Sequence, residues 1–190
     1  MMTARPLHLD GKTIVLVGLM GAGKTSIGRR LAGRLGLPFT DADVEITKAA
    51  GCSIDDIFEL YGEEAFRDGE RRVIARLLED QPHVLATGGG AFMAPETRAR
   101  VAERGISVWL RAGLDLLVER TSRKRTRPLL RTGDPRATLQ RLMDERHPVY
   151  ALADVTVDTG TEPHDITVGR VIEGLWALGD SDGTPPGEAP

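Results

Sequence analysis

A phosphate-binding loop lies between a predicted strand and a predicted helix near the start of this chain. Residues 18–25 read GLMGAGKT and match the pattern G-x-x-x-x-G-K-[ST]. The β-branched run Thr13–Val17 precedes the match, and apolar residues recur at four-residue spacing after it, up to Leu35. The glycines of the loop allow backbone dihedral angles closed to other residues, so successive N–H groups can converge on one phosphate. This order of elements predicts an α/β fold and nucleotide binding.

The loop and the first turn of its helix supply the candidate contacts to ATP and Mg²⁺. The helix N-terminus adds a partial positive charge, and the Lys24 ammonium would reach the β- and γ-phosphates. The Thr25 hydroxyl would complete the coordination shell of Mg²⁺. The alternative is a glycine-rich turn with an incidental lysine, which leaves the complete pattern unexplained. The candidate nucleotide contacts here are Gly21, Ala22, Gly23, Lys24, Thr25 and Ser26.

Short apolar runs alternate with helical segments along the rest of the chain. The further candidate strands are Pro38–Asp41, Val84–Ala86, Ile106–Leu110 and Val155–Val157. With the first strand they predict a five-stranded parallel sheet between two layers of helices, a three-layer α/β/α architecture. We expect one P-loop domain over residues 1–179 and a disordered tail at 180–190, which has no apolar anchor.

A long, mostly helical insertion is expected at about residues 43–80, between the second and third strands. It carries two apolar stripes, and a helix that buries one face shows such a pattern. The first stripe contains Ile54, Ile57, Phe58 and Tyr61, and the second contains Phe66, Val73, Ile74, Leu77 and Leu78.

The composition narrows the possible partners and location. Lys and Arg total 25 against 28 Asp and Glu, a net charge of −3, whereas a nucleic-acid-binding protein usually shows a basic excess. Cys52 is the only cysteine, which excludes an intrachain disulfide and a thiolate zinc site and fits a reducing cytosol. The N-terminus lacks a secretory signal pattern, and no run approaches about 18 apolar residues. We predict a cytoplasmic monomer that contacts neither nucleic acid nor membrane.

Two carboxylates follow the second predicted strand. Asp41 and Asp43 are two residues apart, so in extended backbone both side chains would project to one side. Ligands of an open parallel sheet collect outside the carboxyl ends of its strands. One carboxylate would hold water in the Mg²⁺ shell, and the other would accept a hydrogen bond from an acceptor hydroxyl. The alternative is that either aspartate caps the following helix, with Asp43 directly before Val44.

Two arginines are candidates for binding an anionic acceptor. Arg67 and Glu70 are three residues apart and share a helix face, although an exposed ion pair would show the same spacing. Arg146 continues the apolar stripe of Leu139 and Leu142, which places a cation on the inward face of its helix. The alternative for Arg146 is a helix-end arginine that covers the last carbonyls before Pro148. Residues 88–90 form a triple glycine whose backbone can approach a ligand closely.

The basic segment 121–136 is predicted to be a mobile lid over the nucleotide. Arginines in such a lid would neutralise charge on the transferring phosphoryl group and exclude water. Solvated charges and an RNA-binding run are the alternatives, and the segment has no interleaved aromatic residues. The cations in and next to it are Arg120, Arg123, Lys124, Arg125, Arg127 and Arg131.

Six motifs in this order resemble the shikimate kinase family. They are GLMGAGKTSIGRRLA, DAD, FRDGE, TGGGA, RPLL and ERHPVYALADVTVDT, and the resemblance covers residues 12–178. It implies a nucleoside-monophosphate-kinase-like P-loop fold in which the helical insertion at about residues 43–80 binds the substrate. It also implies ATP-dependent phosphorylation of the 3-hydroxyl of shikimate to give shikimate 3-phosphate and ADP. This reaction is a step of chorismate and aromatic amino-acid biosynthesis.

The resemblance implies roles for individual residues. Lys24, Asp43 and Arg127 are the catalytic candidates, and Arg127 matches the lid arginine that contacts phosphate. Arg67 and Arg146 match the pair that binds the shikimate carboxylate. Asp43 matches the residue that contacts the acceptor hydroxyls, and the acceptor pocket is matched by Gly88, Gly89 and Gly90. Thr25 matches the residue that binds Mg²⁺ directly, and Asp41 matches the one that binds it through water. Arg120 matches a residue near the adenine. Family members often have an arginine-containing stretch where this chain has residues 160–163, GTEP.

Two other functions share part of this pattern. Another small-metabolite kinase of the same fold, such as a gluconate or nucleotide kinase, would keep the loop and the lid. A nucleotide acceptor would require more cations than Arg67 and Arg146. A non-catalytic ATP-binding module would have lost the loop, a carboxylate or the lid arginine, and all of these are present. A signalling GTPase would need an N-K-x-D element, which the sequence lacks.

Overall fold

The computed structural model of the chain describes residues 9–122 and 134–181, which form one parallel sheet with helices on both sides. The strands are β1 (Thr13–Val17), β2 (Phe39–Asp41), β3 (Val84–Ala86), β4 (Gly105–Ala112) and β5 (Val155–Thr159). The helices are α1 (Lys24–Leu35), α2 (Ala42–Ala50), α3 (Ile54–Leu77), η1 (Ala91–Met93, a 3₁₀ turn), α4 (Pro95–Arg104), α5 (Leu114–Ser122), α6 (Pro135–Tyr150) and α7 (His164–Ser181). The predicted α/β/α architecture is confirmed.

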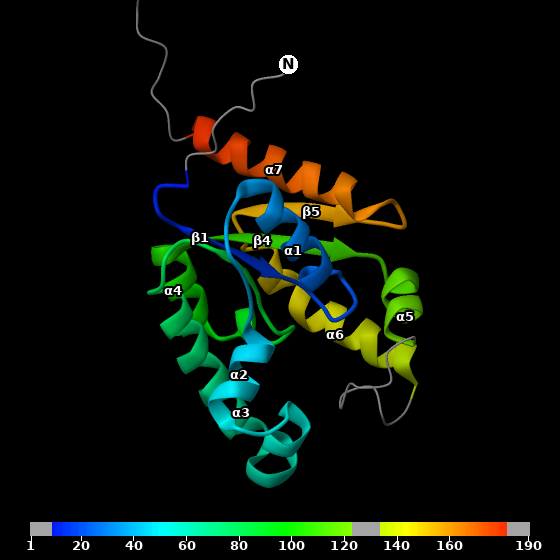
Figure 1. Cartoon of the computed structure of the whole chain (residues 1–190). Helices are drawn as coiled ribbons and strands as arrows, with labels where there is room; N and C mark the ends of the chain where they lie inside the picture. Colours follow the sequence, from blue (N-terminus) through cyan, green and yellow to red (C-terminus); the bar gives the residue numbers. More distant parts are fainter. Residues whose placement is uncertain (1–8, 123–133, 182–190) are drawn as a thin grey trace, which may run out of the picture.

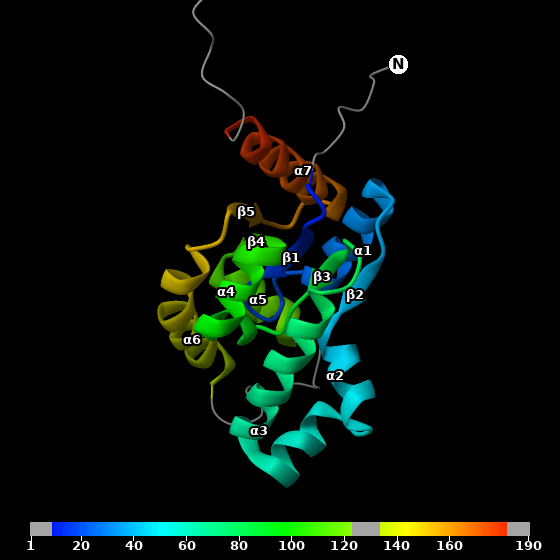
Figure 2. The ribbon, with the colours of Figure 1, turned by 90° about the vertical axis from the view of Figure 1, so that its left-hand side faces the viewer.

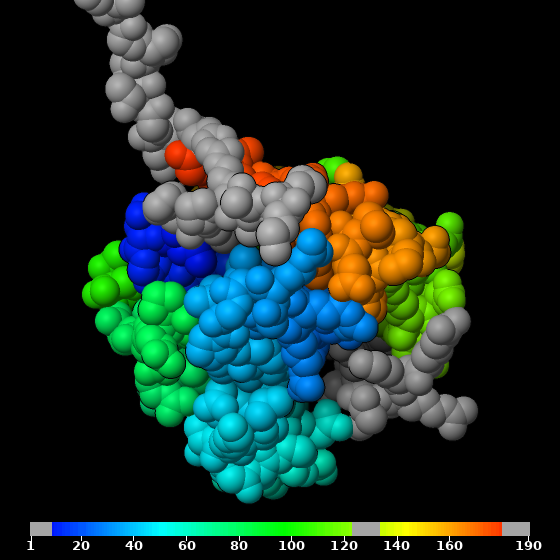
Figure 3. All heavy atoms as spheres, turned by 45° about the horizontal axis from the view of Figure 1, so that its top comes forward, coloured from blue at the N-terminus to red at the C-terminus, as the bar shows by residue number. Residues whose placement is uncertain are grey.

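The five strands are parallel in the order β2-β3-β1-β4-β5, with β1 in the centre. All five residues of β1 are buried because helices cover both faces of the sheet. Helices α1 and α7 lie on one face, and α4 and α6 lie on the other (Figure 1). Helices α1 and α7 also pack against each other, and they form a continuous outer surface in Figure 3.

Helix α1 begins and ends where its sequence predicts. Ile27 and Leu31 are fully buried on the face toward the sheet. Gly36 ends the helix in the left-handed conformation, with φ of 67°, and its N–H bonds to the carbonyl of Ala32. The sheet side of this helix is close-packed, because a Cβ at Gly28 would lie 2.6 Å from the ring of Phe39.

The insertion between β2 and β3 consists of α2 and α3, which project from the sheet (Figure 2). A capping box of Ser53 and Asp56 starts α3. Gly62, with φ of 82° and ψ of 174°, interrupts α3, which explains why the sequence shows two separate apolar stripes. The second stripe is buried, whereas Tyr61 of the first stripe is 68% exposed, contrary to its predicted position.

Several boundaries differ from the sequence-based prediction. Asp43 lies in the first turn of α2, so the extended spacing predicted for it and Asp41 is wrong. Asp41, not Asp43, is the N-cap of α2, and it accepts a hydrogen bond from the Asp43 N–H at 3.1 Å. Pro148 lies inside α6 and does not end it. The φ of proline, fixed near about −65°, is close to that of an α-helix, so the backbone stays helical at Pro148 although one helical hydrogen bond is lost there.

The ends of the predicted lid and tail belong to helices. Residues 121–122 complete α5, and residues 135–136 begin α6. Helix α7 extends to residue 181, past the predicted domain end at 179. Residues 123–133 of the predicted lid, which include Arg127, and residues 182–190 lie outside the described residues. Within residues 9–122 and 134–181, no helix is long and apolar enough to cross a membrane.

Candidate functional site

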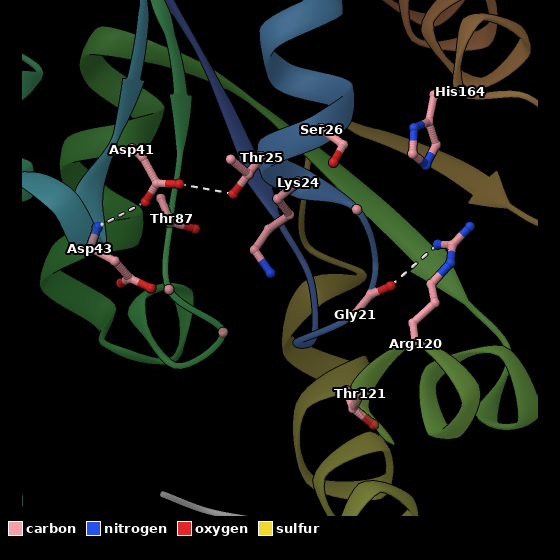
Figure 4. Close-up of a pocket in the computed structure, with 13 residues that line it drawn as sticks. Gly21, Lys24, Thr25, Ser26, Asp41, Asp43, Thr87, Arg120, Thr121 and His164 are labelled. Atoms are coloured by element: carbon pink, nitrogen blue, oxygen red, sulfur yellow. Dashed lines mark hydrogen bonds between the residues drawn. The ribbon is translucent and has the colours of Figure 1, made fainter. Parts of the chain in front are cut away.

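A cavity of about 300 Å³ lies at the carboxyl ends of the central strands. Asp41 and Asp43 lie on one side of it, Arg120 and His164 lie on the other, and Lys24 stands between them (Figure 4). The lining residues are Gly21, Gly23, Lys24, Thr25, Ser26, Asp41, Asp43, Thr87, Gly88, Gly89, Arg120, Thr121 and His164. Parallel sheets bind ligands at this edge, because the loops that follow neighbouring strands meet there.

The phosphate-binding loop has the backbone that the glycine spacing predicts. Gly18, Gly21 and Gly23 have φ values of 141°, 83° and 98°. A Cβ at Gly18 would lie only 2.7 Å from the carbonyl oxygen of Leu110. Gly23 is the N-cap of α1 and provides no side-chain cap, so the first N–H groups of the helix have no capping side chain. This helix N-terminus is therefore suited to an anion.

Most predicted loop contacts line the cavity, and one does not. Gly21, Gly23 and Ser26 belong to the lining. Ala22 is only 1% exposed, and its N–H bonds to the carbonyl of Leu19 at 3.1 Å. Its methyl group therefore packs inside the loop, and Ala22 can support the phosphate site only through the loop's shape.

The cationic and metal-binding candidates of the loop are held by short hydrogen bonds. The Lys24 ammonium donates to the carbonyls of Gly18 and Leu19 at 2.6 and 3.0 Å. The Thr25 hydroxyl donates to Asp41 Oδ2 at 2.8 Å, so the two candidate metal-binding residues are adjacent. No group of three or more His, Cys, Asp or Glu able to hold a metal exists among the described residues. A hydroxyl and one carboxylate nevertheless suit Mg²⁺, which usually keeps several waters and binds substrate phosphates.

Each glycine of the triple-glycine loop after β3 faces a different polar side chain. A Cβ at Gly88 would lie 2.7 Å from Glu70 Oε1 and 3.2 Å from Asp43 Oδ1. A Cβ at Gly89 would lie 3.3 Å from Arg146 Nη1, and one at Gly90 would lie 2.7 Å from Arg67 Nη2. The loop thus brings Asp43, Arg67 and Arg146 together, although they lie on three different helices. Any side chain on the loop would displace one of these groups.

A buried carboxylate holds Arg67 in this arrangement. Glu70 is 2% exposed, and its Oε2 accepts a hydrogen bond from Arg67 Nη1 at 2.8 Å. This contact is largely buried and is not the exposed ion pair that the spacing also allowed. Burial raises the pKa of Glu70, against the opposing effect of Arg67. Glu70 Oε1 has no hydrogen-bond partner in the part of the chain that the structure describes, and it faces Gly88.

Arg120 and His164 form the end of the cavity away from the carboxylates (Figure 4). Arg120 donates to the carbonyls of Gly21 and Gly160 at 3.2 and 2.7 Å, which fixes the guanidinium plane. Burial, together with the charges of Arg30 and Arg120, lowers the pKa of His164, so its ring is neutral at pH 7. A planar cation and a neutral ring at this end are suited to a flat, uncharged ligand group.

Sequence reasoning missed four residues at the site. Thr87, Thr121 and His164 line the cavity, and Tyr150 donates a hydrogen bond to the carbonyl of Gly89. Thr87 directly follows strand β3, and His164 comes shortly after strand β5. Their position relative to these strands was the available signal, because ligands collect at the carboxyl ends of strands. Tyr150 carried no such signal. Arg127, the predicted lid arginine, lies outside the described residues.

The comparisons with known proteins agree with this geometry. The family model described as "Shikimate kinase" matches residues 20–176. The shikimate kinase of Brucella canis is 57% identical over 169 residues, which cover 89% of this chain and 84% of that protein. The shikimate kinase of Paramagnetospirillum magneticum is 58% identical over 92% of this chain and 89% of its own length.

Solved structures show the same likeness. The shikimate kinase of Acinetobacter baumannii, solved in complex with shikimate, has a TM-score of 0.85 and 37% identity to this chain. That alignment covers 93% of this chain and 98% of the solved one. A gluconokinase from Sinorhizobium meliloti has a TM-score of 0.61 but only 21% identity, with coverage of 93% and 97%, so it shares the fold alone.

Proposed function

The chain belongs to the shikimate kinase family, and from this premise we propose how its residues bind and phosphorylate the acceptor. As a member of this family it transfers the γ-phosphoryl group of ATP to the 3-hydroxyl of shikimate, a step of aromatic amino-acid biosynthesis. The observation that carries our assignment of the site is the triple-glycine loop. Its three residues face Asp43 with Glu70, Arg146 and Arg67 in turn.

Arg67 and Arg146 bind the shikimate carboxylate in this proposal. Each is a planar guanidinium, which can form two parallel hydrogen bonds to one carboxylate. Glu70 supports this assignment because its Oε2 accepts a hydrogen bond from Arg67 and so holds the guanidinium beside the triple-glycine loop. Its unpaired oxygen beside Gly88 would accept a hydrogen bond from an acceptor hydroxyl, which removes the cost of a buried polar atom without a partner.

Asp43 orients the hydroxyl that is phosphorylated. Its carboxylate lies beside Gly88 at the boundary between the acceptor groups and the phosphate-binding loop. Phosphoryl transfer depends chiefly on positioning and charge stabilisation, so orienting the hydroxyl contributes more than proton removal. Lys24 contacts the transferring phosphates, and Arg127 also contacts phosphate in this proposal, as its match to the family's lid arginine implies. Arg120 and His164 contact the adenine, where a fixed cation and a neutral ring face the cavity.

Thr25 would bind Mg²⁺ directly, and Asp41 would bind it through water. The hydrogen bond between them, at 2.8 Å, supports the assignment, because it places the Thr25 hydroxyl and the Asp41 carboxylate next to each other beside the loop. When bound, Mg²⁺ would neutralise charge on the phosphates of ATP. We also propose that the enzyme works as a monomer in the cytoplasm, since one chain supplies every group named here.

An ADP-release assay across shikimate, gluconate and AMP tests the proposed function. We expect turnover with shikimate and background rates with the other two. In R67A, the KM for shikimate should rise by more than about tenfold while the KM for ATP changes little, because one of the two carboxylate contacts is lost. The matched control is R71A on the same helix, since Arg71 pairs with Asp68 outside the cavity. Equal effects of R67A and R71A would contradict the assignment.

A further inference from the structure

Tyr150 is the last residue of α6 and the largest fully buried side chain of the described core. Its hydroxyl donates a hydrogen bond to the carbonyl of Gly89, 61 residues earlier in the chain. The rings of Trp109 and His147 lie 5.9 and 6.3 Å from its ring, measured between centroids. A phenol without solvent exposure requires a partner for its hydroxyl, and the partner here belongs to the acceptor site.

Gly89 lies between the acceptor site and the phosphate-binding loop. A Cβ at this position would lie 3.3 Å from Arg146 Nη1 on one side. On the other side it would lie 3.6 Å from both the carbonyl oxygen of Gly18 and the N–H nitrogen of Met20. The peptide that Tyr150 holds therefore has the acceptor arginine on one side and the loop that binds phosphate on the other.

Arg146 also lies near this hydroxyl and lowers its pKa against the effect of burial. Arg146 and Tyr150 are four residues apart on α6, so their side chains lie on one helix face. The Arg146 guanidinium is within hydrogen-bonding reach of the Tyr150 oxygen. A phenolic hydroxyl can donate one hydrogen bond and accept others at the same time. Tyr150 can therefore donate to Gly89 while it accepts from Arg146.

We propose that Tyr150 is a positioning residue that fixes Arg146 and the Gly89 peptide relative to each other and so determines the affinity for the acceptor. This inference rests on the proposed role of Arg146 in binding the shikimate carboxylate. Tyr150 contacts neither substrate in this proposal. It aligns the group that holds the acceptor with the loop that holds the phosphates, and phosphoryl transfer depends chiefly on such alignment.

Burial keeps the Tyr150 hydroxyl protonated, against the opposing charges of Arg146 and Arg67. Burial raises the pKa of Tyr150 to about 12, and the charged groups that face it are Arg146 from α6 and Arg67 and Glu70 from α3. His147, next to Arg146, has its pKa lowered by burial and by Arg111 and is neutral at pH 7. Because the hydroxyl keeps its proton at neutral pH, it donates to Gly89 and takes no proton from the acceptor.

The variant Y150F tests the proposal, because it removes the hydroxyl and keeps the ring. We expect the KM for shikimate to rise about tenfold, as for loss of a hydrogen bond to a charged partner, and the KM for ATP to stay within about twofold. Y61F is the matched control, since Tyr61 is the only other tyrosine and is 68% exposed. Calorimetric titration with shikimate and with ADP should show the same selectivity.

A loss of thermal stability in Y150F with an unchanged KM for shikimate would overturn the proposal, because Tyr150 would then act only in packing. R146A separates this result from failure of the proposed function. If R146A raises the KM for shikimate and Y150F does not, Arg146 binds the acceptor as proposed but Tyr150 does not position it. If neither variant changes this KM, the acceptor site itself is wrong.

A second substitution covers the case in which Y150F does not fold. Site-specific replacement of Tyr150 by 3,5-difluorotyrosine keeps the ring and the hydroxyl but makes the phenol more acidic. An ionised phenol cannot donate to Gly89, so the Kd for shikimate should rise from neutral to alkaline pH more steeply than in the unmodified enzyme. The Kd for ADP should follow the same course in both proteins. Identical pH dependence of shikimate binding in the two proteins would overturn the proposal.

Discussion

At the scale of single residues, Asp41 and Asp43 have different surroundings although they are neighbours in sequence. Asp41 ends β2, caps α2 and accepts the hydrogen bond of Thr25. Asp43 lies two residues later, inside the first turn of α2, and its carboxylate faces Gly88. The helix therefore separates the two carboxylates into one beside the phosphate loop and one beside the acceptor groups.

We predict that Asp43→Asn lowers kcat by roughly 10²-fold, because the amide is neutral and holds the acceptor hydroxyl less well. The Kd for ADP should stay near its wild-type value, since the phosphate loop is unchanged. Steady-state kinetics and calorimetric titration with ADP measure the two quantities. Asp115→Asn is the control, because Asp115 is 86% exposed on α5 and pairs with Arg136. Near-normal turnover of the Asp43 variant would rule out its proposed role.

Glu70 predicts a pH dependence of stability. Its pKa is raised in the folded protein, so the folded state binds more protons than the unfolded state above the ordinary value of 4.5. Its contribution to the free energy of unfolding is therefore complete at low pH and falls as the pH rises through the folded pKa. Urea unfolding across this range should show that Glu70→Gln gains stability relative to wild type as the pH increases. A constant or opposite difference would contradict the raised pKa.

At the scale of elements, a glycine in the loop after β3 is crowded by a neighbouring side chain, whereas a glycine inside helix α3 has open space beside it. Gly90 has an ordinary φ of −97°, so only the contact with Arg67 opposes a side chain there. Gly69 lies inside α3, and a Cβ at this position would have nothing within 4 Å. The two positions therefore separate the effect of a crowded site from the effect of helix propensity.

Gly90→Ala should raise the KM for shikimate by more than about tenfold, because the added methyl group displaces the guanidinium of Arg67. Gly69→Ala should leave this KM unchanged and stabilise the protein by up to about 1 kcal/mol through helix propensity. Kinetics and urea unfolding of both variants measure these effects. A normal shikimate KM in the Gly90 variant would show that Arg67 can move without loss of binding.

At the scale of the whole molecule, the site joins segments that are far apart in sequence. Arg120 contacts Gly21 across 99 residues, and Tyr150 contacts Gly89 across 61. Ligands that bind only the folded state therefore stabilise the complete domain, by about 2.7 kcal/mol at a concentration 100 times the Kd. For a chain of this size that corresponds to a rise in Tm of roughly 5–11 °C.

We predict that shikimate and ADP each raise the Tm of the wild-type protein by about this amount when present at 100 times their Kd. R146A should lose most of the shift from the same concentration of shikimate and keep the shift from ADP. R141A is the control, because Arg141 pairs with Glu145 on the exposed side of α6. Differential scanning calorimetry measures the shifts. An equal loss of both shifts in R146A would indicate a general loss of folding and not of acceptor binding.

Local patterns in the sequence were sufficient for the strands, the phosphate-binding loop and the first helix. The run Thr13–Val17 is buried on both faces as its lack of alternation predicts, and the loop glycines have the expected positive φ values. The inward position of Arg146 was also predictable from its place on an apolar stripe. These features depend on neighbouring residues and on the helical or strand period, which the sequence displays directly.

Other features depended on contacts between distant segments. The sequence did not indicate that Glu70 lies buried behind Arg67 or that Tyr150 supports Gly89. Each of these depends on which side chain from another element fills the space beside the triple-glycine loop. The sequence by itself thus determined the type of fold and the chemistry of the phosphate loop, because both arise from local backbone preference. Tertiary packing alone decided which polar groups meet beside the triple-glycine loop, because their burial and partners come from helices far apart in the chain.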